Sequence, residues 1–120
     1  MRVAVLGGTR FIGVALVEEL LVHGHEPTVI HRGRTEARDQ PDVPHVHVDR
    51  HATHDLTGAF AGVRPEAFID ASAYSAKDAA AALAALPEGV PAVALSSQDV
   101  YRAFHTFLTG GRALDPLPLD

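Results

Sequence analysis

Short apolar runs alternate along the chain with segments in which apolar residues recur at helical spacing. Arg2 to Leu6 (RVAVL) is almost wholly apolar, which is typical of a strand buried on both faces of a parallel sheet. From Ile12 to Leu20 apolar residues return every three or four positions, which predicts a helix that ends near His23 and Gly24. The chain therefore opens with a strand, a glycine-rich turn and a helix.

The same alternation continues towards the C-terminus. Further strands are predicted at 28–30, 46–48, 67–70 and 92–95, and further helices at 55–61, 77–86 and 99–108. Strands that alternate with helices predict an α/β fold, here a Rossmann-type doubly wound parallel sheet of about five strands in the order 3-2-1-4-5, with helices on both faces. We expect residues 1–109 to form this dinucleotide-binding domain and 110–120 to be an irregular tail.

Composition narrows the class of protein. The 120 residues are 47% hydrophobic and 21% charged, and the formal net charge is -5, which is typical of one folded globular domain and gives no electrostatic reason to expect nucleic-acid binding. The absence of cysteine excludes disulfides and thiolate metal sites. No apolar stretch approaches the ~20 residues that cross a bilayer, and the first apolar run is too short for a secretory signal. We expect a cytoplasmic protein that contacts no membrane.

The glycine-rich turn between the first strand and the first helix predicts a phosphate-binding site. It reads Gly7-Gly8-Thr9-Arg10-Phe11-Ile12-Gly13. The amino end of a helix offers unpaired N–H groups to an anion, and a pyrophosphate reaches them only across a tight turn without bulky side chains. The alternative is an ordinary strand-to-helix turn in which the glycines serve geometry alone.

The turn, together with Gly24-His25 and the strand at 28–30, resembles the extended short-chain dehydrogenase/reductase superfamily, and within it the NAD-dependent epimerase/dehydratases. The resemblance covers nearly the whole chain. The family usually has glycine where this sequence has Arg10, so GGTRFIG is similar to an atypical branch that includes the chloroplast stem-loop-binding-protein-like reductases. The resemblance implies a dinucleotide cofactor held by residues 7–13.

The residues after the second predicted strand indicate which dinucleotide is preferred. The resemblance implies that an acidic residue here would select NAD, but this sequence has His31, followed by Arg32 and Arg34. Arginine forms charge-assisted hydrogen bonds with a 2′-phosphate, so NADP is favoured over NAD, and Arg10 could add to the same site. The alternative is that these arginines belong to a solvated loop.

The resemblance implies further cofactor contacts at the carboxyl ends of later strands. Asp49 and Arg50 should flank the adenine, and Ala71-Ser72-Ala73 should let the cofactor backbone lie close. Ser96 and Ser97 begin a segment, SSQDVY, that matches the family's SSxxVY. Ser96 is expected at the cofactor. Ser97 is expected to hydrogen-bond the substrate's reacting oxygen, although a serine that only caps the next helix is nearly as well supported.

The family's Tyr-x-x-x-Lys pair is missing, because the chain's only lysine, Lys77, lies three residues after Tyr74. The sequence therefore leaves two functions open. One is the cofactor-binding part of an oxidoreductase or epimerase that acts on a carbonyl compound or nucleotide sugar, with a small-molecule substrate only if further residues complete the site. The other is a non-catalytic NADP-binding or interaction module, such as a truncated or inactive relative. In either case an unprotected sheet edge predicts self-association.

Histidines suggest a metal site but do not establish one. His45, His47, Asp49 and His51 alternate, which would place them on one face of a strand. The same alternation describes the polar face of a strand whose other face carries Val46 and Val48. Because the sequence offers no second coordinating cluster, we expect no metal ion.

Overall fold

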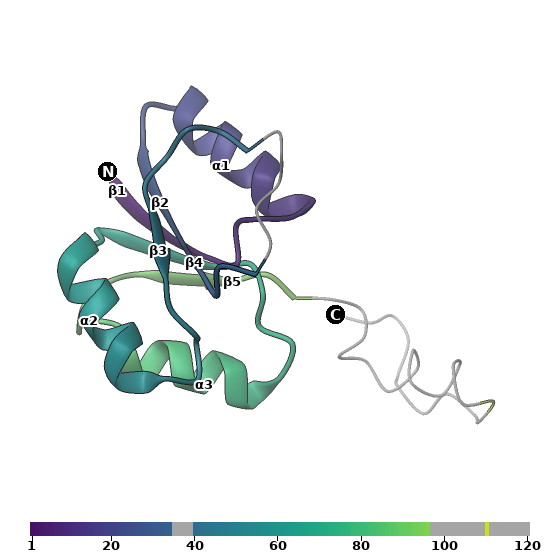
Figure 1. The fold of residues 1–120 in the computed structure, drawn as a ribbon, viewed down its shortest axis with the longest axis vertical. Helices are drawn as coiled ribbons and strands as arrows, with labels where there is room; N and C mark the ends of the chain where they lie inside the picture. The colour runs from purple at the N-terminus through teal and green to yellow at the C-terminus, as the bar shows by residue number, and fades with distance from the viewer. Residues whose placement is uncertain (35–39, 97–109, 111–120) are drawn as a thin grey trace.

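The structure, a computed structural model, describes residues 1–34, 40–96 and 110. Its centre is a parallel five-stranded sheet in the order β3-β2-β1-β4-β5, so the predicted order 3-2-1-4-5 is confirmed (Figure 1). The strands are β1 (Arg2–Leu6), β2 (Glu26–His31), β3 (His45–His47), β4 (Ala67–Asp70) and β5 (Ala92–Ala94). The helices are α1 (Ile12–Val22), α2 (Thr53–Val63) and α3 (Ala76–Ala85). The helix predicted at 99–108 lies outside the described residues.

Alternating side chains of β1 supply two separate cores, one on each face of the sheet. Val3 and Val5 pack with Val17 of α1 on one face, whereas Ala4 and Leu6 pack with residues of α2 and α3 on the other. Figure 1 shows α1 on one side of the sheet and α2 and α3 on the opposite side. The fold is therefore the doubly wound Rossmann type that the sequence predicted.

Some boundaries differ from the prediction because strand pairing extends or shifts the elements. β2 begins at Glu26, two residues before the predicted strand, because it pairs with β1 from Arg2 onward. β3 begins at His45, one residue early, because His45 is the register partner of Val29 in β2. α2 is longer than predicted at both ends. These shifts leave the sheet order unchanged.

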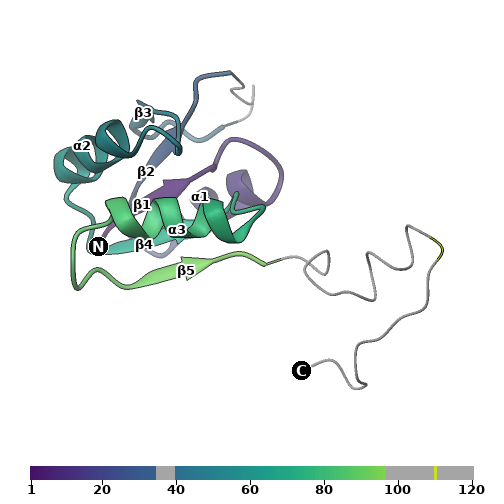
Figure 2. The same cartoon turned by 90° about the horizontal axis from the view of Figure 1, so that it is seen from below.

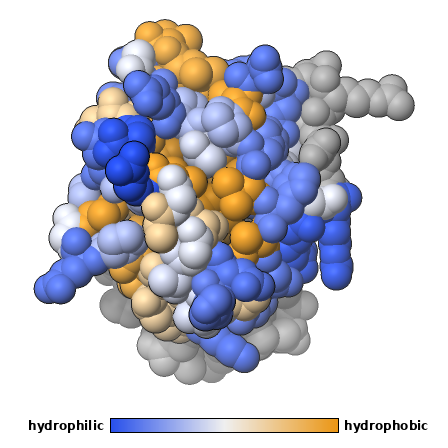
Figure 3. All heavy atoms as spheres, turned by 60° about the vertical axis from the view of Figure 1, so that its left-hand side comes forward, coloured by the Kyte–Doolittle hydropathy of each residue, from blue (hydrophilic) through white to orange (hydrophobic). Residues whose placement is uncertain are grey.

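The two edges of the sheet are β3 and β5, which lie at opposite ends of it in Figure 2. The residues of β5 are exposed, whereas those of β1 after Arg2 are buried. On the face in Figure 3, hydrophobic residues lie among hydrophilic ones. In the part of the chain that the structure describes, no helix has the length and apolar character needed to cross a membrane.

Candidate functional site

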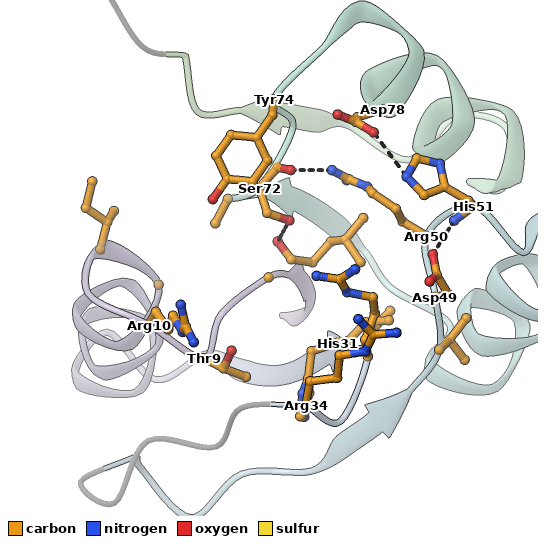
Figure 4. Close-up of a pocket in the computed structure, with 18 of the residues that line it drawn as sticks. Thr9, Arg10, His31, Arg34, Asp49, Arg50, His51, Ser72, Tyr74 and Asp78 are labelled. Carbon is orange, nitrogen blue, oxygen red and sulfur yellow. Dashed lines mark hydrogen bonds and ion pairs between the residues drawn. The ribbon is translucent and has the colours of Figure 1, made fainter.

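A pocket of about 630 Å³ opens at the carboxyl ends of β1, β2 and β4, beside the amino end of α1 (Figure 4). This edge of an open α/β sheet is where such folds bind ligands. The structure brings together here most of the residues that the sequence predicted for the cofactor: Gly7, Thr9, Arg10, Phe11, Ile12, Gly13, His31, Arg32, Arg34, Asp49, Arg50, Ala71 and Ser72.

A few predicted residues do not line the pocket. Gly8 is buried beneath the turn, where a side chain would meet Val5 and Val29. Ala73 is half-buried just beyond the lining residue Ser72, and Ser96 is exposed after β5. Ser97, the predicted catalytic residue, lies outside the described residues.

The glycines of the turn are required by close approach of other atoms. Gly7 has a φ of +87°, and a Cβ there would lie 2.3 Å from the Ser72 Oγ. A Cβ on Gly13 would lie 2.7 Å from the Gly8 Cα and 2.9 Å from the Gly7 carbonyl oxygen. The missing side chain of Gly13 therefore lets the start of α1 lie against the turn itself. These missing side chains leave a narrow cradle at the start of α1.

Arg10, which replaces the family's usual glycine, does not strain the turn. The described non-glycine residues with positive φ are Phe11 (φ 41°) and Arg64 (φ 49°), so Arg10 has an ordinary backbone conformation. The unusual conformation falls on Phe11, which precedes α1 and whose side chain is 88% exposed. In Figure 4, Arg10 comes from the turn and Arg34 from the segment after β2, so basic side chains reach the pocket from two elements.

The end of β2 presents basic rather than acidic groups to the pocket. His31 is buried at the last position of β2, and Arg32 and Arg34 follow it with exposed side chains. The carboxylates among the lining residues are Asp49 and Asp78, which come from the segment after β3 and from α3. The pocket is therefore electropositive where β2 ends.

A buried ion pair fixes the floor of the pocket, and sequence reasoning missed its acidic member, Asp70. The Arg50 guanidinium donates to Asp70 Oδ2 at 2.6 Å and to the Ser72 carbonyl oxygen at 2.5 Å, and the Ser72 N–H donates to Asp70 Oδ1 at 3.0 Å. Burial raises the pKa of Asp70, against the opposing effects of the Ser72 N–H and the Arg50 charge. Arg50 thus ties the segment after β3 to the end of β4. In the sequence, nothing near Asp70, the last residue of β4, indicated that it pairs with Arg50.

Two further residues line the pocket that the sequence did not predict there. Asp78 lies in the first turn of α3, and Tyr74 precedes that helix. Ser75 caps α3: its Oγ accepts from the Asp78 N–H at 3.2 Å and donates to Asp78 Oδ2 at 2.9 Å. That hydrogen bond is the main reason the pKa of Asp78 is lowered, and the charges of Arg50 and His51 lower it further against partial desolvation. The sequence could have predicted these two residues, because the helix that follows β4 must start at the edge of the sheet where β4 ends.

The alternating set at 45–51 is not brought together as one face. β3 ends at His47, so Asp49 and His51 lie beyond the strand. The Asp49 carboxylate accepts from the His51 N–H at 2.9 Å, and the His51 ring lies 3.4 Å from Asp78. His45 and His47 instead lie beside His31 of β2.

The doubly wound sheet with a glycine turn at its ligand-binding edge defines a Rossmann-type nucleotide-binding protein class. The family model of the NAD dependent epimerase/dehydratase family matches residues 3–86. The chain therefore belongs to that family, as the sequence motifs indicated. No curated protein matches it.

Solved structures with the same fold include a protein from Burkholderia cenocepacia with 23% identity and a TM-score of 0.73, over 84% of this chain and 39% of that one. The NAD complex of UDP-glucose 4-epimerase from Thermus thermophilus has 35% identity and a TM-score of 0.55, over 62% of this chain and 25% of that one. UDP-glucose-4-epimerase from Stenotrophomonas maltophila, with NAD and formylated UDP-arabinopyranose, has 22% identity and a TM-score of 0.70, over 84% of this chain and 38% of that one. The matched region is thus well under half of each of these proteins.

Proposed function

We propose that the pocket binds a nicotinamide dinucleotide and prefers NADP to NAD. The observation that carries the proposal is the junction of two features in one pocket: the glycine cradle before α1, and the basic end of β2. The first accepts a pyrophosphate and the second accepts a 2′-phosphate. The epimerases from Thermus and Stenotrophomonas that share the fold are complexes with NAD, which supports a nicotinamide dinucleotide as the cofactor.

The cradle suits a pyrophosphate for a physical reason. α1 begins at Ile12 without a side-chain hydrogen bond at its amino end and without an acidic residue in its first turn. The Gly13 N–H donates to the Arg10 carbonyl oxygen at 2.8 Å, so an anion would meet the other N–H groups of the first turn and the positive end of the helix dipole. Because Gly7 and Gly13 lack side chains, the anion can approach the backbone.

The preference for NADP rests on charge at the end of β2. An NAD-selective site places a carboxylate there for the ribose hydroxyls, and this chain places His31, Arg32 and Arg34 at that end of the pocket. A guanidinium forms short, charge-assisted hydrogen bonds with phosphate oxygens. The 2′-phosphate, which only NADP carries, is the group that these side chains can recognise.

Calorimetric titration of the purified chain with NADPH and with NADH tests both parts. We expect NADPH to bind at least about tenfold more tightly than NADH. The double variant Arg32→Gln/Arg34→Gln should lose at least about tenfold in affinity for NADPH while NADH binding is unchanged, since even one charged hydrogen bond contributes about 1.5–3 kcal/mol. Arg64→Gln, an exposed arginine outside the pocket, is the matched control. Equal affinities would contradict the NADP preference, and no binding of either would contradict the cofactor site.

For the reaction, we propose that this part of the molecule holds the cofactor and contributes Ser97 to hydride transfer on a carbonyl compound or nucleotide sugar. A bound nicotinamide supplies the hydride chemistry, and the protein orients it. The 120 residues contain no Tyr-x-x-x-Lys, and the alternative function is a non-catalytic dinucleotide-binding module. An assay of NADPH oxidation or UDP-glucose conversion by the chain decides between them: turnover that Ser97→Ala abolishes supports the enzyme, and none, with NADPH bound, supports the module. The absence of cysteine supports a cytoplasmic location for either.

A further inference from the structure

The sheet brings three histidines together beside the pocket. In the parallel pairing of β2 with β3, His31 is the register partner of His47 and Val29 is the partner of His45. Side chains two residues apart on a strand share a face, so His45 and His47 point the same way. Val29 packs in the α1-side core and Ile30 in the opposite one, so His31 also lies on the α1 side. Register alone therefore makes the three rings neighbours.

The ring geometry is that of a compact cluster. The His31 ring is edge-on to both others, with centroids 5.0 Å from His45 and 4.6 Å from His47. His31 Nε2 and His45 Nδ1 are 2.8 Å apart. One ring nitrogen from each of the three histidines lies within 4.8 Å of those of the other two.

We propose that His31, His45 and His47 bind a divalent transition metal ion, with zinc as the ion of first choice. Neutral imidazole is a preferred ligand of zinc, nickel and copper. Zinc–nitrogen bonds of about 2.0–2.1 Å place tetrahedral ligand atoms about 3.4 Å apart, a separation inside the 4.8 Å within which the three histidine nitrogens lie. The rings need only small rotations to bind the ion.

The surroundings of the cluster fit an ion that enters from solvent. His31 is buried, His45 is half-buried and His47 is exposed, so one side is open and a fourth coordination position remains for water. The Gly33 N–H donates to His31 Nδ1 at 3.2 Å, so His31 Nε2 carries the proton shared with His45 in this tautomer. To bind the ion through Nε2 as a neutral ring, His31 would carry its proton on Nδ1 instead, and the Gly33 N–H would give up its hydrogen bond to that nitrogen. Such an ion would fasten the edge strand β3 to β2.

Zinc titration of the untagged full chain tests the site, with calorimetry for stoichiometry and thermal unfolding for stabilisation. We expect one zinc ion per chain and a higher unfolding midpoint with zinc, because an ion that binds only the folded chain stabilises it. His45→Gln and His47→Gln should each weaken zinc binding at least about tenfold and remove the shift in midpoint. His54→Gln is the matched control, since the His54 side chain is fully exposed on α2, outside the cluster. Zinc affinity unchanged in the His45 and His47 variants would overturn the proposal.

Two further measurements protect this test. Co²⁺ in place of Zn²⁺ should give the wild-type chain the intense visible absorption of a low-symmetry histidine site, and the spectrum of the hydrated ion would overturn the proposal without any variant. His45 and His47 do not line the dinucleotide pocket, so their variants should bind NADPH as the wild type does. If the His45 and His47 variants lose zinc but keep NADPH, the metal site is separate from the dinucleotide pocket. The metal proposal and the proposed function can then be rejected independently.

Discussion

At the scale of single residues, Arg64 stores strain at the end of α2. Its left-handed backbone (φ 49°, ψ 60°) costs a residue with a Cβ roughly 1–2 kcal/mol. The hydrogen bonds at this position use its backbone: its N–H donates to the Phe60 carbonyl oxygen, and its own carbonyl oxygen accepts from the Arg2 Nε. We expect Arg64→Gly to raise the free energy of unfolding by about 0.5–1 kcal/mol, since the unfolded chain's added freedom offsets part of the relief.

Thermal unfolding followed by circular dichroism checks this expectation, as a gain of that size raises the midpoint by a few degrees. Arg64→Gln is the control, because it removes the same charge and keeps the Cβ. A glycine variant no more stable than the glutamine variant would show that the backbone is not strained.

Local signals predicted the residues of the glycine-rich turn, and they missed residues whose role depends on contacts with distant parts of the chain. Gly7 and Gly13 were found because a strand, a turn and a helix follow one another in the sequence. Asp70 was missed because its partner Arg50 is twenty residues away along the chain, and nothing local links them. His31 was assigned to the cofactor alone, because only the register of β2 with β3 reveals its neighbours.

At the scale of elements, the amino end of α3 makes the stability of the protein depend on pH. The hydrogen bond from Ser75 lowers the pKa of Asp78 in the folded chain. A carboxyl with a depressed folded pKa stabilises the fold above its unfolded pKa, about 3.8, and that contribution is lost as the pH falls through the folded value. We expect Asp78→Asn to lower the unfolding midpoint near pH 6, and the gap from the wild type to close below about pH 3.8.

Unfolding midpoints measured for both proteins across this pH range test the sign. Asp55→Asn is the control, because Asp55 lies in the first turn of α2, whose amino end has no side-chain cap. A gap that stays constant from neutral to acid pH would show that the Asp78 charge does not contribute through this cap.

The type of each element could be predicted because strands and helices differ in their pattern of apolar residues. β1 is a continuous apolar run, whereas the apolar residues of α1 recur every three or four positions. Element ends could not, because pairing sets them. β2 gains Glu26 only because its N–H donates to the Met1 carbonyl oxygen and the strand runs alongside β1 from there. β3 shifts by one residue for the same reason, since Val29 of β2 sets its start.

At the scale of the whole molecule, the alternation of strands and helices predicted a parallel sheet with helices on both faces. The order 3-2-1-4-5 came from the Rossmann-type interpretation, because alternation alone also fits other doubly wound orders. What alternation does not predict is how well each strand is covered. β1 lies between two strands and is buried, whereas β5 pairs with β4 alone within the described part of the chain and Val93 is 58% exposed.

An exposed apolar edge strand is a template for pairing with another chain, so we expect the protein to self-associate through β5. Size-exclusion chromatography with light scattering should give a mass above 12.7 kDa that increases with concentration. Val93→Lys should shift the protein towards monomer, because a charged edge strand resists pairing. Leu83→Lys, an exposed apolar position on α3, should leave the mass unchanged. A single monomeric peak for the wild type would rule out self-association. If Val93→Lys and Leu83→Lys lowered the mass equally, the association would rest on non-specific contact between apolar surfaces. Pairing through the edge of the sheet should be sensitive only to the substitution on β5.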